Sequence, residues 1–163
     1  MGDVTIAQAV TDRSGITGEK MELDGYMTLE GPAIATYNHQ GKNFLCTMVA
    51  LSKEVDPKVG HEVAMQVAAA SPVSATRESV DPAVVEHEMS IYKAQAAESG
   101  KPENIQEKIA TGRMEKFYKE NCLTEQAFVK NPDQSVNDYT AEVAKALGTT
   151  IEIVSFTRFM LGE

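Results

Sequence analysis

The pattern of apolar and polar positions predicts two β-strands in the first third of the chain. Residues 33–39 and 44–51 are rich in β-branched and aromatic side chains, and the second segment is almost wholly apolar. Such an uninterrupted apolar run is typical of a buried central strand. A polar, glycine-containing stretch, 38–43, connects the two segments. We therefore expect a β-hairpin whose second strand lies inside a sheet.

The next apolar pattern has a helical period. Asp-Pro pairs at 56–57 and 81–82 each place an acidic N-cap before a proline, which is typical of a helix start. After the first pair, Val59, Val63 and Val67 recur at helical spacing until a proline at position 72. We expect this helix to cover one face of the sheet, and a second helix to run from position 82 to about 99.

A third helix is predicted directly after the second. Gly100 suits the position just past a helix end, and Pro102 suits the start of the next helix, which continues to about residue 120. Two helices joined by three residues fold back as an antiparallel hairpin. Because both helices are charged outside their apolar stripes, the hairpin either projects as a contact arm for another chain or packs into the core. Periodicity leaves both arrangements open.

An internal similarity relates the two ends of the chain. Segments 18–31 and 148–162 align at a constant offset of 130, which pairs Met21 with Ile151, Glu22 with Glu152 and Leu23 with Ile153. Each unit reads as a short helix, a glycine-marked turn and a strand. The similarity indicates one supersecondary unit used twice. Chance resemblance of two amphipathic segments is the alternative.

The composition allows a packed core and disfavours some partners. Hydrophobic residues make up 42% of the 163 residues, so neither a metal nor a disulfide is needed as a staple. The net charge of -9 disfavours direct binding to nucleic acid. No apolar run approaches the ~20 residues of a membrane span. The chain also shows no signal peptide and reads as a piece of something longer, so we expect a cytoplasmic protein.

The residue patterns do not favour catalysis. Cys46 and Cys122 lack the CxxC spacing and are expected to be buried free thiols in a reducing compartment. His61 and His87 each precede a glutamate, but neither has the second histidine of a zinc motif. No phosphate-binding loop and no nucleophile motif occurs. We therefore expect no enzyme activity, no cofactor and no metal.

The candidate binding residues lie in the predicted hairpin turn. They are Tyr37, Asn38, His39 and Gln40. An aromatic ring and an imidazole on a rigid turn form a good contact for a partner protein, because little conformational entropy is lost on binding. An ordinary polar turn is the alternative interpretation.

Three stretches resemble one known family. Residues 100–130 read GKPENIQEKIATGRMEKFYKENCLTEQAFVK. This is similar to the elongation factor Ts family, in which G-K-P-x-x-I-x-E-K-x-x-x-G-R precedes a lysine–aromatic pair and an L-x-x-Q-x-F-V segment. Residues 63–72 (VAMQVAAASP) resemble the family's core helix, and residues 155–163 (SFTRFMLGE) its closing strand. The resemblance covers most of the chain in colinear order.

This resemblance implies an α+β fold. The expected architecture is a three-stranded antiparallel sheet with helices on one face and a protruding antiparallel helical hairpin. Residues 1–80 and 121–163 would form a core subdomain, in which 1–17 are the tail of a preceding subdomain. Residues 81–120 would form the hairpin, which mediates dimerisation in some members of the family. A homodimer through this hairpin is therefore a possible assembly.

The resemblance also implies a function in protein synthesis. The family is the guanine-nucleotide exchange factor for the GTPase elongation factor Tu, which it contacts through a histidine in a Y-x-H motif. Residues 37–39 match that motif, so the contact role is carried onto His39 and, with less support, onto Tyr37. The family's amino-terminal module and its T-D-F-V loop have no counterpart here, which implies weak binding and poor acceleration of GDP release. The alternative function is a stand-alone dimerisation or scaffold module that acts through the hairpin.

Overall fold

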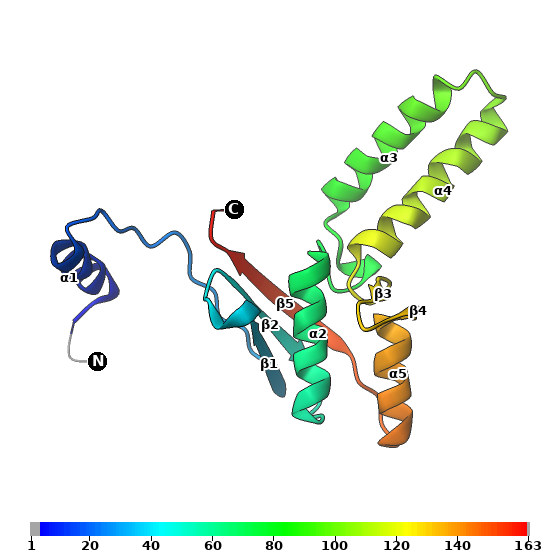
Figure 1. Ribbon diagram of the computed structural model, residues 1–163. Helices are drawn as coiled ribbons and strands as arrows, with labels where there is room; N and C mark the ends of the chain where they lie inside the picture. Colours follow the sequence, from blue (N-terminus) through cyan, green and yellow to red (C-terminus); the bar gives the residue numbers. More distant parts are fainter. Residues whose placement is uncertain (1–3, 163) are drawn as a thin grey trace.

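The computed structural model describes residues 4–162 and consists of a sheet-based core, a projecting helical arm and an N-terminal segment (Figure 1). Residues 1–3 and 163, which the sequence analysis assigned to the leading tail and the closing strand, lie outside the described part.

A three-stranded antiparallel sheet in the order β1-β2-β5 forms the base of the core. Strand β1 spans Ala33–Asn38, β2 spans Leu45–Leu51 and β5 spans Ile153–Met160. The apolar strand β2 is central and pairs with both neighbours. The predicted hairpin, the buried central strand and the closing strand are therefore confirmed, as is the α+β class.

Helix α2 (Pro57–Ala70) crosses one face of this sheet at short range. Asp56 caps it by accepting a hydrogen bond from the Lys58 amide at 2.8 Å. The predicted Asp-Pro helix start is thus confirmed. Where the helix passes over β1, a Cβ added to Gly60 would lie 2.6 Å from the Ala35 Cβ. Only glycine permits this approach, because real Cβ atoms do not come so close.

One apolar core fills the space between the sheet, α2 and α5 (Val136–Ala146). Helix α5 is capped by Ser135, whose hydroxyl accepts from the Asp138 amide at 3.0 Å. Burying one valine or leucine side chain of this core stabilises the fold by roughly 1.5–3 kcal/mol, so the core is the main source of stability. Its least exposed members are Val49, Leu51, Val63, Val67, Leu123 and Val136.

A second, two-stranded ladder was not predicted. Strand β3 (Ala127–Phe128) pairs with β4 (Asn131–Ser135), although β4 contains a proline and an aspartate, which are rare in strands. Tertiary contacts hold it in place. The Phe128 ring stacks on Tyr139 of α5 with 4.4 Å between centroids.

A buried carboxylate on α2 ties that helix to the same region. The Glu62 side chain accepts hydrogen bonds from Lys130 Nζ at 2.8 Å and from the Tyr139 hydroxyl at 2.5 Å. Burial alone raises the pKa of Glu62, but the two hydrogen bonds and the charge of Lys130 outweigh burial and leave the pKa below its ordinary value. The folded chain therefore favours the ionised form of Glu62.

This depressed pKa predicts a pH-dependent contribution to stability. The contribution is present above the pKa of Glu62 in the unfolded chain and is lost as the pH falls through the lower folded value. We expect Glu62→Gln to cost about 1–2 kcal/mol in urea unfolding at pH 7, and much less near pH 3. Glu107→Gln, on an exposed part of α4, is the control and should show neither effect. An equal cost of Glu62→Gln at both pH values would contradict the prediction.

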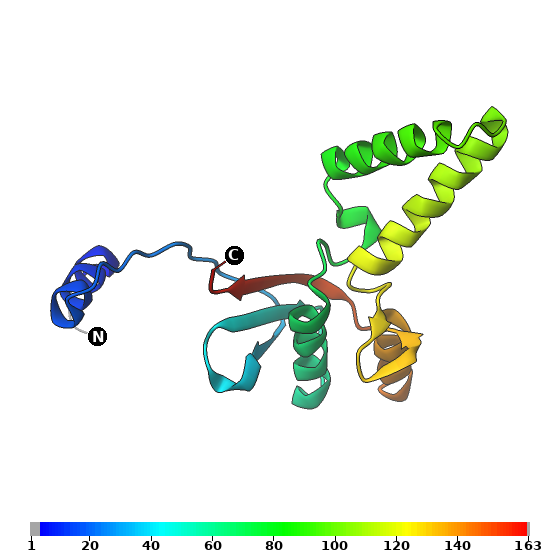
Figure 2. The same cartoon turned by 45° about the horizontal axis from the view of Figure 1, so that its top comes forward.

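Helices α3 (Pro82–Ala97) and α4 (Glu103–Asn121) run antiparallel and project away from the sheet (Figures 1 and 2). Of the two arrangements that the periodicity left open, the structure has the projecting one. Tyr92 is partly buried where the two helices meet, and this burial is the main reason that its pKa is raised to about 12. A hydrogen bond to Glu88 is the second reason. In these two helices Val84 is the one large apolar side chain that is exposed. The seam at the base of the arm consists of Val85, Met89, Tyr92, Met114 and Phe117.

The N-terminal segment corrects one prediction. Helix α1 (Ile6–Thr17) ends at Gly18 with a left-handed φ of 72°, as expected, and none of its residues is buried. Residues 20–32 form no strand and cross the outer face of the sheet, where Met27 Sδ lies 3.1 Å from the Thr157 hydroxyl. The strand predicted for the first repeat unit is therefore wrong, because within residues 4–162 no strand lies beside this segment to complete its hydrogen bonds.

Candidate functional site

The turn between β1 and β2 has a defined backbone conformation. Residues His39–Gly41 form a single 3₁₀ turn, within which Gln40 adopts a left-handed φ of 55°. Asn38 closes the turn, since its Oδ1 accepts a hydrogen bond from the Asn43 amide at 3.0 Å and its side chain also bonds that of Asn43. The turn is thus fixed by its own side chains.

His39 is held from two sides. The Tyr37 hydroxyl hydrogen-bonds to Nδ1 of His39 at 2.9 Å, and the Phe44 ring meets the imidazole edge-on with 5.7 Å between centroids. Within the described part of the chain, Nε2 of His39 has no hydrogen-bond partner. When Tyr37 donates to Nδ1, the neutral imidazole carries its proton on Nε2 and can donate it to another molecule.

His61 is a third member of this cluster and was missed by the sequence analysis as a site residue. It lies on α2, and its ring meets Tyr37 edge-on with 5.3 Å between centroids. The close crossing of α2 at Gly60 places the next residue beside β1. Gly60 inside the predicted helix was compatible with a close crossing, but the sequence did not indicate which element α2 would cross.

The predicted site residues therefore separate into two groups. Tyr37 and His39 are brought together and are half-buried, whereas Asn38 and Gln40 are exposed. His39 lies in the turn as expected and is half-buried there, because Phe44 and Tyr37 cover part of its imidazole. The turn presents a restrained imidazole beside two exposed amide side chains.

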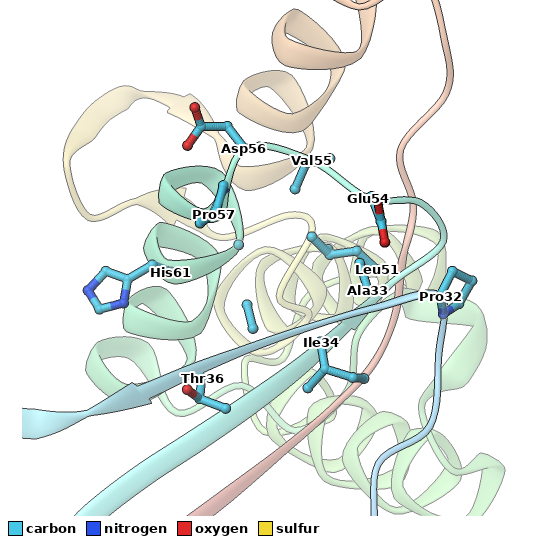
Figure 3. A pocket seen from close by; sticks show the side chains of 12 residues that line it. Pro32, Ala33, Ile34, Thr36, Leu51, Glu54, Val55, Asp56, Pro57 and His61 are labelled. Carbon is cyan, nitrogen blue, oxygen red and sulfur yellow. The ribbon is translucent and has the colours of Figure 1, made fainter.

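A shallow groove runs along the outer edge of β1 (Figure 3). It encloses about 600 Å³ and is bordered by β1, by the start of α2 and by the loop that carries Glu54 and Asp56. Figure 3 shows those two carboxylates on the loop side and Ile34 and Thr36 on β1. The groove brings no nucleophile together with a base.

Among residues 4–162, no three His, Cys, Asp or Glu side chains gather in a way that could hold a metal ion. Cys122 is buried as expected, whereas Cys46 is only half-buried. No described helix is long and apolar enough to cross a membrane.

The geometry defines an α+β chain with a three-stranded antiparallel sheet, a β1–β2 turn held by its own side chains, and a projecting helical arm. The model of the family described as elongation factor TS matches residues 1–163. The elongation factor Ts of Porphyromonas gingivalis is 40% identical over 157 residues, which cover 96% of this chain and 56% of that protein. That of Agrobacterium fabrum is 42% identical over 169 residues, which cover 98% of this chain and 55% of that protein.

The chain belongs to the elongation factor Ts family. It spans a little more than half the length of the curated relatives that it matches. The resemblance noted from the sequence is confirmed.

Proposed function

We propose that the chain acts in protein synthesis as the part of a guanine-nucleotide exchange factor that binds elongation factor Tu. It binds through the β1–β2 turn, with His39 as the main contact and with Tyr37, Asn38 and Gln40 beside it. Residues 1–80 and 121–163 act as the core subdomain and residues 81–120 as the arm. The activity is protein binding in the cytoplasm, without chemical conversion, cofactor, nucleic acid or membrane.

The observation that carries this proposal is the restrained imidazole of His39. Its Nδ1 is hydrogen-bonded to the Tyr37 hydroxyl and its ring meets Phe44 edge-on. When Tyr37 is the donor in that bond, Nε2 carries the proton that a partner can accept. A contact group that is already fixed loses little entropy when a partner binds. The family membership and the Y-x-H match at residues 37–39 add support for the partner.

The test is a titration of this chain against elongation factor Tu by calorimetry. His39→Ala is expected to weaken binding by at least about 10-fold, because a central contact in an interface is typically worth more than 1 kcal/mol. The matched control is His87→Ala, an exposed histidine on α3, which should bind like the parent chain. Equal affinities of the parent chain and His39→Ala would contradict the proposed contact.

The same experiment separates the alternative function. A stand-alone dimerisation module requires only that the chain associates with itself through the arm. Val84 is the one large apolar side chain exposed on α3 and α4, which weighs against a large apolar arm–arm interface. Self-association without any binding of elongation factor Tu would favour that alternative.

A further inference from the structure

Two short chain segments, 71–81 and 122–126, join the arm to the core. They meet in a parallel bridge between Ser74 and Cys122, and the Leu123 amide donates to the Ser74 carbonyl at 2.9 Å. These backbone bonds lie within one short stretch, between residues 73–75 and 121–124, which we call the pivot. By themselves they would let the pair of helices swing about this stretch.

Arg77 lies beside this pivot and contacts both sides of it. Its Nη1 and Nη2 donate to the Glu115 carboxylate at 3.1 Å each, and its Nε and Nη2 donate to the Glu125 carboxylate at 2.7 Å each. The guanidinium carbon also lies 4.6 Å from the centroid of the Tyr118 ring. Two paired contacts and one stacked ring restrain the guanidinium group in orientation as well as in position.

The two carboxylates belong to different parts of the molecule. Glu115 is on α4, about 9 Å up the helix from its end at Asn121. Glu125 follows the pivot and is held on the core side, because the buried side chain of its neighbour Gln126 bonds that of Gln66 on α2 at 3.2 Å. Gln126 Nε2 also donates to the Glu120 carbonyl at 2.8 Å, next to the end of α4, and this bond lies at the pivot. Arg77 therefore bridges the arm and the core at a point away from the pivot.

The backbone that carries Arg77 is itself fixed. The Thr76 amide donates to the Ser79 hydroxyl at 2.9 Å, and the Ser79 amide donates to the Thr76 carbonyl at 3.2 Å. These bonds close the short turn Arg77–Ser79. The hydrogen bonds that Arg77 donates to Glu125 and Glu115 also raise the pKa of its guanidinium group, which favours the charged form.

We propose that Arg77 is the positioning residue that sets the direction of the helical arm relative to the sheet. It ties Glu115 of the arm to Glu125 of the core across the pivot. Without these contacts the arm swings about the pivot and the packing around Cys122 at its base loosens, while the two helices of the arm and the core stay folded. This inference does not depend on the partner or on the role of His39.

Cys122 is a reporter at the pivot. Its side chain is fully buried against the base of the arm, and burial raises the pKa of its thiol. Cys46 is half-buried on β2 and serves as an internal reference. The rate of alkylation by iodoacetamide, resolved by peptide mass spectrometry, reports separately on the pivot and on the core.

In the full chain we expect Arg77→Ala and Arg77→Lys to raise the alkylation rate of Cys122 by at least about 10-fold and to leave Cys46 unchanged. Lysine fails because it cannot make both paired contacts. Small-angle X-ray scattering should show a wider distribution of overall dimensions. The matched control is Arg113→Ala, which removes a cation that bonds Gln95 within the arm. This control should change neither readout.

Two results would overturn the proposal. One is an unchanged Cys122 rate or an unchanged scattering profile in the Arg77 variants. The other is a faster alkylation of both cysteines, which would indicate general unfolding of the Arg77 variants. In that case the alkylation rates are measured for Glu125→Gln, which keeps the side-chain size and removes only the charge. That variant must accelerate Cys122 alone. If it does not, Arg77 supports the whole fold and does not set the direction of the arm.

Discussion

Replacing Gln66 with leucine is expected to lower the free energy of unfolding by about 3–5 kcal/mol, since each buried polar group left without a partner costs about 1–3 kcal/mol. The Gln66 side chain is only 1% exposed. It donates to the Gln126 side chain and to the Ala127 carbonyl at 3.2 Å each, and accepts from the Val129 amide at 2.7 Å. Leucine fills the space but removes all three hydrogen bonds, of which the one to Gln126 is fully buried and the other two are partly buried.

Urea unfolding at pH 7, followed by circular dichroism, measures this loss. Gln8→Leu on α1 is the matched control, because Gln8 is exposed and bonds only its helix neighbour Asp12. That control should change stability by no more than about 0.5 kcal/mol. A loss below about 1 kcal/mol for Gln66→Leu would mean that the partners find other hydrogen bonds.

The second large effect is expected at the crossing of α2 and β1. Gly60→Val should cost about 3 kcal/mol, because its Cβ would meet Ala35 at 2.6 Å and only a backbone shift can relieve the overlap. Such a shift also moves the neighbouring His61 away from Tyr37. The Gly60→Val variant should therefore lose the packing of His61 against Tyr37, next to the β1–β2 turn, together with part of its stability.

A matched valine substitution gives the control for Gly60. Gly112 on α4 has no atom within 4 Å of an added Cβ, so Gly112→Val should stay within about 0.5 kcal/mol of the parent chain. Adding Ala35→Gly to Gly60→Val removes the Ala35 Cβ and should recover a large part of the lost stability. Thermal unfolding of the parent chain, the two valine variants and the double variant measures these differences. Equal losses at positions 60 and 112 would show that helix propensity, and not the overlap, is responsible.

The sequence predicted correctly those features, such as helix ends and turns, that are determined by residues close together in the chain. The Asp-Pro pairs and Gly100 fixed the helix boundaries correctly, because caps and turns act within a few residues. The β3–β4 ladder escaped notice, since Phe128 becomes a strand residue only through its contact with Tyr139 of a later helix. The supposed strand near Met21 was wrong for the matching reason: alternation alone supplies no partner strand.

The candidate site divides in the same way. Tyr37 and His39 are two residues apart at the end of a strand, which places them on one side of the chain, so their pairing was accessible from spacing. His61 joins them only because α2 crosses β1 at Gly60, a fact of packing. Arg77 gave no pattern at all, because Glu115 and Glu125 are brought to it by the way α4 returns to the core.

The central strand has a consequence for the order in which a ribosome produces this molecule. Leu45 at the start of β2 pairs with Met160 of β5, so one edge of β2 stays open until β5 has been synthesised. The β1–β2 hairpin and the arm can form earlier, because their contacts are local. The nascent chain thus carries an apolar strand with one unpaired edge while the arm and α5 are made, a state prone to aggregation that ends only when β5 pairs with β2.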